Sequence, residues 1–125
     1  MKISNLCWLI KTDKEITDSQ LEEIKNFINA CNLEGITLLT QAAFSKKKDL
    51  VKKFIDEYGA YVNAKNSDNT TALDYAAYNY NVPTIHVLIY RGVDVSDKLY
   101  GKIKGYEQLY ERCLASKKIV EKYNE

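Results

Sequence analysis

The stretch that decides the fold runs from Gly35 to Asp97 and reads GITLLTQAAFSKKKDLVKKFIDEYGAYVNAKNSD, then NTTALDYAAYNYNVPTIHVLIYRGVDVSD. The second part, 69–97, repeats the first, 35–68, at an offset of 34 residues. The matching pairs are Thr37 with Thr71, Leu39 with Leu73, Ala42-Ala43 with Ala76-Ala77, Val51 with Ile85, Phe54 with Leu88, and Ile55 with Ile89. Self-similarity at this spacing is typical of proteins built from stacked structural repeats.

The apolar spacing inside each copy predicts two short helices joined by a tight turn. In the second copy, small and apolar residues recur at i, i+3 and i+4 before and after Pro83, which is the spacing of one helix face. Pro83 suits the first turn of a helix, where its missing N–H costs nothing. We expect helices near 38–45, 49–57, 72–79 and 83–90. The segments that follow each pair begin with Gly and are rich in Asn, Asp and Ser, as turns require.

The segment before the repeats is predicted to form a degenerate helix pair. Residues 2–11 suit one helix and Ser19–Cys31 a second, with Thr17 or Asp18 as the N-cap. An apolar triplet in the second helix matches the first copy at an offset of 27, pairing Ile24 with Val51, Phe27 with Phe54 and Ile28 with Ile55. That offset is 7 residues short of 34, so the sequence predicts that this unit lacks the long protruding turn.

The segment after the repeats is expected to cap the other end. A helical stripe over 98–114 contains Leu99, Ile103, Tyr106, Tyr110 and Cys113, and the segment 118–123 resembles the second helix of a repeat. The prediction is an all-α solenoid of about four helix pairs in one domain, 1–125. Repeats 35–68 and 69–97 lie between an N-terminal capping pair, 1–34, and C-terminal capping helices, 98–125.

These two copies resemble the ankyrin repeat, whose consensus is close to GxTPLHxAAxxGxxxIVxxLLxxGADVN over about 33 residues. GITLLTQAA with GAYVNAK, and NTTALDYAA with GVDVS, carry the resemblance, which covers 35–97 clearly. It implies an ankyrin-repeat solenoid that recognises other proteins through a concave surface of turn tips and first helices. It also implies that the molecule works by binding and needs no cofactor.

The sequence departs from that consensus in two places. The TPLH tetrapeptide is Thr-Leu-Leu-Thr at 37–40 and Thr-Ala-Leu-Asp at 71–74, so the buried imidazole hydrogen bonds of the family are lost. Thr40 and Asp74 are candidates for weaker substitutes. The glycine between the two helices is replaced by Lys46 and Tyr80. We expect a stack that is less stable and less regular than a consensus one.

Charge and composition argue against nucleic-acid and membrane partners. The chain has 18 Lys and Arg against 17 Asp and Glu, which leaves a formal charge of +1 and no overall attraction for polyanions. The cluster Lys46–Lys48 with Lys52 and Lys53 is interpreted as a solvated helix end, diluted by nearby carboxylates. A nucleic-acid site would require it to join further basic residues on one face.

Location is predicted from the N-terminus and the cysteines. The apolar run Leu6–Ile10 is shorter than a secretory signal, and no stretch of about 18 apolar residues follows. The three cysteines are widely spaced and odd in number, which favours reduced thiols over disulfides. We expect a cytoplasmic protein, with export as an effector left open.

No pattern of catalytic or metal-binding residues is present. His86 is the single histidine and falls on a variable outer position of a second helix. An enzyme would need a cysteine or a carboxylate beside it. Three scattered cysteines and one histidine do not have zinc-ligand spacing. The sequence therefore predicts no enzyme, no metal site and no cofactor.

The candidate binding surface follows from the resemblance and lies on the turn tip and first helices. The predicted patch consists of Phe44, Ser45, Lys65, Ser67, Asp68, Tyr78 and Asn79. Phe44 and Tyr78 are its expected anchors, because aromatic side chains offer large contact area at low entropic cost. The alternative is that both rings only fill space between helices. We expect a monomer that binds one protein partner, as an inhibitor or immunity-type protein, a host-directed effector or a scaffold.

Overall fold

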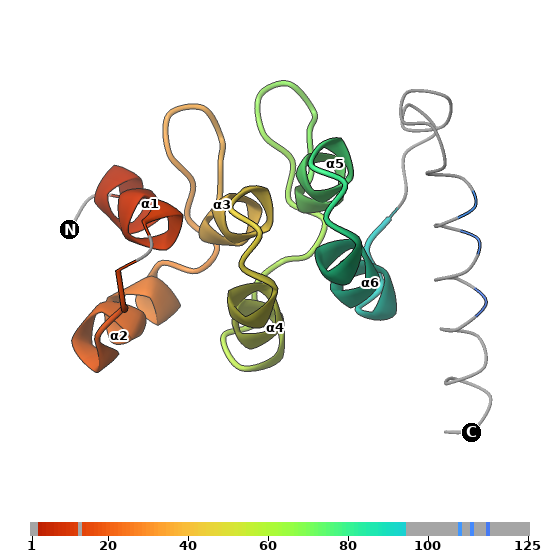
Figure 1. Cartoon of the computed structure of the whole chain (residues 1–125). Helices are drawn as coiled ribbons and strands as arrows, with labels where there is room; N and C mark the ends of the chain where they lie inside the picture. Colours follow the sequence, from red (N-terminus) through yellow and green to blue (C-terminus); the bar gives the residue numbers. More distant parts are fainter. Residues whose placement is uncertain (1–2, 13, 95–107, 109–110, 112–114, 116–125) are drawn as a thin grey trace.

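The computed structural model describes residues 3–12, 14–94, 108, 111 and 115. Within these residues it contains six helices: α1 (Ile3–Lys11), α2 (Asp18–Asn26), α3 (Leu38–Phe44), α4 (Lys48–Asp56), α5 (Ala72–Tyr78) and α6 (Val82–Tyr90). Helices α1, α3 and α5 form one layer, and α2, α4 and α6 form a second layer beneath it (Figure 1). The fold is an all-α repeat solenoid. Apart from residues 108, 111 and 115, the predicted C-terminal capping helices, 98–125, lie outside the described residues.

The helices of both central repeats begin and end close to the predicted positions. The first helix of each repeat begins after a threonine N-cap, Thr37 or Thr71, whose hydroxyl accepts a hydrogen bond from the amide three residues later. Asp74 completes a capping box by accepting from the Thr71 amide at 2.9 Å. Thr40 bonds to the Thr37 hydroxyl at 3.0 Å. In the positions where the family has histidine, these two side chains therefore help to cap their own helices.

The predicted core is confirmed. Six side chains that the repeat alignment assigned to the interior are at most 1% exposed: Leu39, Val51, Phe54, Leu73, Ile85 and Leu88. The alanine pairs 42–43 and 76–77 are equally buried, and their small size allows α3 and α5 to pack closely together. The 34-residue spacing thus places equivalent residues in equivalent core positions along the stack.

The turn between the two helices of each repeat requires a left-handed residue. Lys46 has φ 61° and Tyr80 has φ 50°, at the positions where the family has glycine. The turns are closed by the same hydrogen bonds, from the Lys47 amide to the Ala42 carbonyl and from the Asn81 amide to the Ala76 carbonyl, both 3.0 Å. Each repeat therefore preserves the turn without its glycine.

The protruding turns, which we call fingers, occur before both α3 and α5 (Figure 1). In the second finger, the Asn66 side-chain oxygen accepts from the amides of Asp68 and Thr70. Asn32 makes the equivalent two bonds in the first finger, at 2.9 and 3.0 Å. The prediction that the N-terminal unit lacks this turn is therefore wrong. An asparagine that bonds to its own turn was the missed signal.

The predicted alignment of the second N-terminal helix is also wrong. Helix α2 begins after Thr17, as predicted, but ends at Asn26 rather than at Cys31. Ile24 is fully buried, whereas Phe27, which was aligned with the buried Phe54, is 40% exposed. Helices α2 and α4 match at an offset of 30, not 27, so Ile24 takes the place of Phe54. A triplet of apolar residues fits either register, and packing decides between them.

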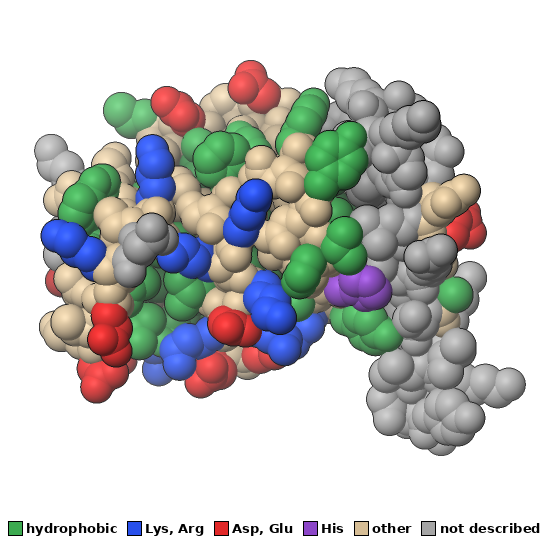
Figure 2. All heavy atoms as spheres, viewed as in Figure 1, with side chains coloured by type: hydrophobic (Ala, Val, Ile, Leu, Met, Phe, Trp, Pro, Cys, Tyr) green, Lys and Arg blue, Asp and Glu red, His purple; other side chains and the backbone are tan. Residues whose placement is uncertain are grey.

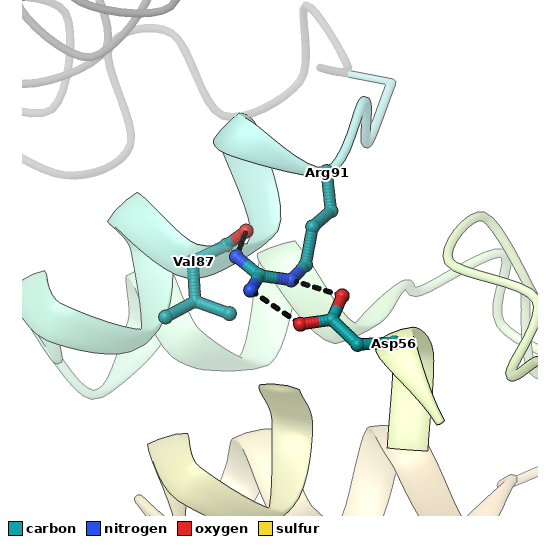
Figure 3. Close-up of polar contacts among 3 residues, drawn as sticks. All are labelled: Asp56, Val87 and Arg91. Atoms are coloured by element: carbon teal, nitrogen blue, oxygen red, sulfur yellow. Dashed lines mark hydrogen bonds and ion pairs between the residues drawn. The ribbon is translucent and has the colours of Figure 1, made fainter. Parts of the chain in front are cut away.

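Polar contacts join each repeat to the next. Arg91, just after α6, binds the carboxylate of Asp56 at the end of α4 through two hydrogen bonds of 2.8 and 2.7 Å (Figure 3). Asn29 accepts from the Tyr61 amide at 2.8 Å, linking the segments that follow α2 and α4. Such bonds hold the repeats in fixed register and so keep the exposed face of α3 and α5 in one arrangement.

Candidate functional site

A pocket of about 180 Å³ opens where α3, α5 and the first finger meet. Its lining residues are Ile36, Thr40, Gln41, Phe44 and Tyr75. Phe44 and Tyr75 form one edge of it, with ring centroids 5.5 Å apart and ring planes at 88°. An edge-to-face pair of this kind is favourable in itself and holds both rings in place. The site is therefore an aromatic pocket built from two successive repeats.

Tyr75 also connects the pocket to the fingers. Its hydroxyl accepts a hydrogen bond of 2.8 Å from the side-chain amide of Asn66, in the second finger. Burial, and then the negative charges of Asp68 and Glu34, raise the pKa of the Tyr75 hydroxyl. The Ser67 hydroxyl donates to the Glu34 carbonyl at 2.9 Å and joins the two fingers. The pocket thus lies beneath two linked fingers that carry carboxylates.

The two predicted aromatic anchors are exposed. Phe44 retains 48% of its accessible surface and Tyr78 retains 55%, so neither is a space-filling core residue. The Asn79 side chain donates a 2.9 Å hydrogen bond to the Phe44 carbonyl and joins the ends of α3 and α5. Ser45 is half-buried and accepts a 2.9 Å bond from Gln41. Four of the predicted residues therefore lie at the ends of two neighbouring helices.

The remaining predicted residues lie on the second finger. Lys65, Ser67 and Asp68 are all exposed. Asn66, between them, reaches Tyr75, and Tyr75 contacts Phe44. The finger and the helix ends are thus connected through two residues that the sequence-based patch omitted.

Sequence reasoning missed most of the pocket lining. Ile36, Gln41 and Tyr75 were not in the predicted patch, although Gln41 and Tyr75 are equivalent residues at an offset of 34. Their position, three residues before the predicted anchors Phe44 and Tyr78, places them about one helical turn away on the same side of the helix. That spacing was the available signal.

The lysine cluster occupies the turn between α3 and α4. Lys46, Lys47 and Lys48 line a second, wider pocket of about 420 Å³ together with Asp49, Leu50, Asn81 and Pro83. Lys47 donates to the Thr12 carbonyl at 3.3 Å, and Lys53 pairs with Glu57 at 3.6 Å. Figure 2 shows basic and acidic side chains mixed over this face. Within the described residues, this face therefore carries both charge signs, whereas a nucleic-acid site is typically a single basic face.

The structure places the single histidine and a buried cysteine away from the pocket between α3 and α5. His86 stacks on Tyr90, with ring centroids 6.5 Å apart. Cys7 is buried, and burial raises the pKa of its thiol, which disfavours the reactive thiolate. In the described ranges, no group of three His, Cys, Asp or Glu side chains is placed to hold a metal ion. Among the helices of that same part, none is long and apolar enough to cross a membrane.

Comparison with known families agrees with the repeat architecture. A family model described as ankyrin repeats, in three copies, matches residues 5–98 of this chain. The match extends further toward the N-terminus than the sequence resemblance did, and it includes most of α1, all of α2 and the first finger. No curated protein matches the chain.

Proposed function

This chain belongs to the ankyrin-repeat family, and from that premise we propose that it binds one protein partner through the face formed by its fingers and first helices. Ankyrin repeats are protein-interaction modules in general. The proposal adds the face, the anchors and the single partner. In this proposal the protein acts by binding its partner and not by catalysing a reaction.

The observation that carries the proposal is the pair of exposed aromatic side chains at the ends of α3 and α5, of which Phe44 also lines the pocket. Phe44 and Tyr78 expose about half of their surface, and a hydrogen bond from the Asn79 side chain to the Phe44 carbonyl links the ends of their two helices. Exposed aromatic side chains beside a concave pocket are typical binding hot spots. Because the helices are already ordered, little conformational entropy is lost on association.

The size of the surface supports one partner rather than several. A standard interface buries about 800 Å² on each side. Three helix pairs in the described part offer one such face between the fingers and the ends of α3 and α5.

Affinity capture from the source cell with the full chain as bait tests the proposal. The wild-type chain is compared with Phe44→Ala and Tyr78→Ala as matched baits, and with His86→Ala on α6 as a control. The proposal expects a protein that the wild type and the control retain and both aromatic variants lose. A partner retained by the aromatic variants and lost by the α6 control would refute the assigned face. The identity of the captured protein then distinguishes an inhibitor, an effector and a scaffold.

A further inference from the structure

The pocket between α3 and α5 has the geometry of an aromatic corner. The rings of Phe44 and Tyr75 stand nearly perpendicular, at 88°, and both line the cavity. Ile36 adds an aliphatic side to the lining. A planar group that enters such a corner meets the face of one ring and the edge of the other. The corner thus offers a π surface and an apolar contact at the same time.

The charges on the finger segments around this corner, 31–37 and 64–71, are negative on balance: Glu34 and Asp68 outnumber the single cation, Lys65. Glu34 and Asp68 are exposed on the two fingers. Burial first, and then the negative charges of Asp68 and Glu34, raise the pKa of the Tyr75 hydroxyl. No lysine or arginine is among the residues that line the pocket in the described structure. A negative potential over aromatic rings favours cations and disfavours carboxylates and phosphates.

The volume limits the ligand to one side chain. A protein cavity of about 150 Å³ holds a benzene molecule, and this pocket measures about 180 Å³. That is enough for a guanidinium group with part of its aliphatic stem. The Gln41 amide nitrogen donates to Ser45 at 2.9 Å, which leaves the amide oxygen as the acceptor on that side chain. Gln41, one of the lining residues, therefore keeps an acceptor oxygen for an N–H donor of a ligand.

We propose that this pocket receives an arginine side chain of the protein partner, with the guanidinium against Phe44 and Tyr75 and the carboxylates of Glu34 and Asp68 nearby. The inference rests on the proposed function and names the chemistry that the face selects. Arginine fits better than lysine because its planar cation stacks on aromatic rings and is less strongly hydrated. The partner segment at this point is accordingly basic.

Titration of the ¹⁵N-labelled full chain with N-acetyl-arginine amide, followed by NMR, tests the inference without the partner. The uncharged isostere N-acetyl-citrulline amide and N-acetyl-leucine amide are the comparison ligands. We expect the arginine compound to shift the amides of Gln41, Phe44 and Tyr75, and to bind about tenfold tighter than citrulline, since a cation–π contact and weak ion pairs add together. The double variant Glu34→Gln, Asp68→Asn should reduce that preference to about threefold, because the cation–π contact remains when the ion pairs are lost. The double variant Glu15→Gln, Glu22→Gln makes the same charge change on other exposed residues and should retain it.

Three results would overturn the inference. Citrulline or leucine binding as tightly as arginine would show that the pocket selects shape or apolar surface and not charge. Chemical-shift changes confined to residues outside the pocket would show that the arginine compound binds elsewhere. The absence of any binding would show that the pocket is not an arginine site. None of these results touches the proposed function, which depends on how the Phe44 and Tyr78 variants bind the partner.

Discussion

Arg91 donates two hydrogen bonds, of 2.8 and 2.7 Å, to the carboxylate of Asp56 and so links the end of α6 to the end of α4 (Figure 3). The guanidinium also donates to the Val87 carbonyl at 3.4 Å, in the last turn of its own helix. A cation at that position is favoured by the helix dipole. The hydrogen bond from Arg91 lowers the pKa of Asp56 below its ordinary value. One side chain thus joins two successive repeats and closes a helix.

Replacing Arg91 by Ala should lower the free energy of unfolding by about 1 kcal/mol at neutral pH, the upper end for an exposed ion pair. Because the pKa of Asp56 in the folded state lies below its ordinary value of 3.8, the contribution is fully present above that value. It is lost as the pH falls through the folded pKa. Urea unfolding at pH 7 and near pH 3 measures both effects. A double-mutant cycle with Asp56→Asn isolates the pair, and an unchanged difference at low pH would contradict the ion-pair explanation.

The substitution Leu73→Ala should cost about 2–5 kcal/mol, because it leaves a cavity in a packed interior. Leu73 is fully buried on α5. Leu33, on the first finger, is 105% exposed, and Leu33→Ala is the matched control, expected to change stability by less than about 0.5 kcal/mol. Chemical denaturation of both variants compares them directly. Equal effects at the two positions would mean that α5 is not packed as described.

Lys46→Gly should stabilise the protein by about 0.5–1 kcal/mol. Lys46 has φ 61°, and a left-handed backbone costs a non-glycine residue about 1–2 kcal/mol. Glycine also loses more backbone entropy on folding than lysine does, and this loss offsets about 0.5–1 kcal/mol of the strain that is relieved. Lys48→Gly removes the same charge within the first turn of α4 and should instead destabilise. A lower melting temperature for Lys46→Gly would show that the turn is not strained.

Tyr78→Ala and Phe44→Ala should each weaken binding of the captured partner by about 2 kcal/mol or more, about thirtyfold, as expected for aromatic anchors. Isothermal titration calorimetry gives the affinities, and circular dichroism checks that the helices remain. His86→Ala, on α6 in the second layer, should bind normally. Normal binding by both aromatic variants would show that the partner binds another face of the molecule.

The fold of the two central repeats followed from local pattern. The apolar positions of α3–α6 recur every 34 residues, and each one predicted to be interior, such as Leu39 and Leu88, is buried. In the N-terminal unit the apolar pattern predicts the wrong alignment of α2 with α4. Phe27 is 40% exposed there because Ile24, three residues earlier, already occupies the interior. A single copy with a shortened connection gives too few apolar positions to separate the two registers.

The candidate site depended more on tertiary structure. The exposure of Phe44 and Tyr78 was predictable, since both follow the buried alanine pairs of their helices. The pocket was not, because Tyr75 and Phe44 lie 31 residues apart in the chain and their rings meet when α3 and α5 stack. The link through Asn66 likewise requires the finger to fold back over α5.

The amino-acid sequence by itself determined the repeat, its helices and its interior, because helix formation and burial follow from the spacing of apolar residues along one segment. The tertiary structure decided which surface residues act together. Contacts such as those of Phe44 with Tyr75, Asn79 with the Phe44 carbonyl and Ser67 with Glu34 join different repeats. Their geometry is set by how closely neighbouring helices pack, which small residues at 42–43 and 76–77 permit. No local spacing encodes the distance between two repeats, and that distance shapes the pocket.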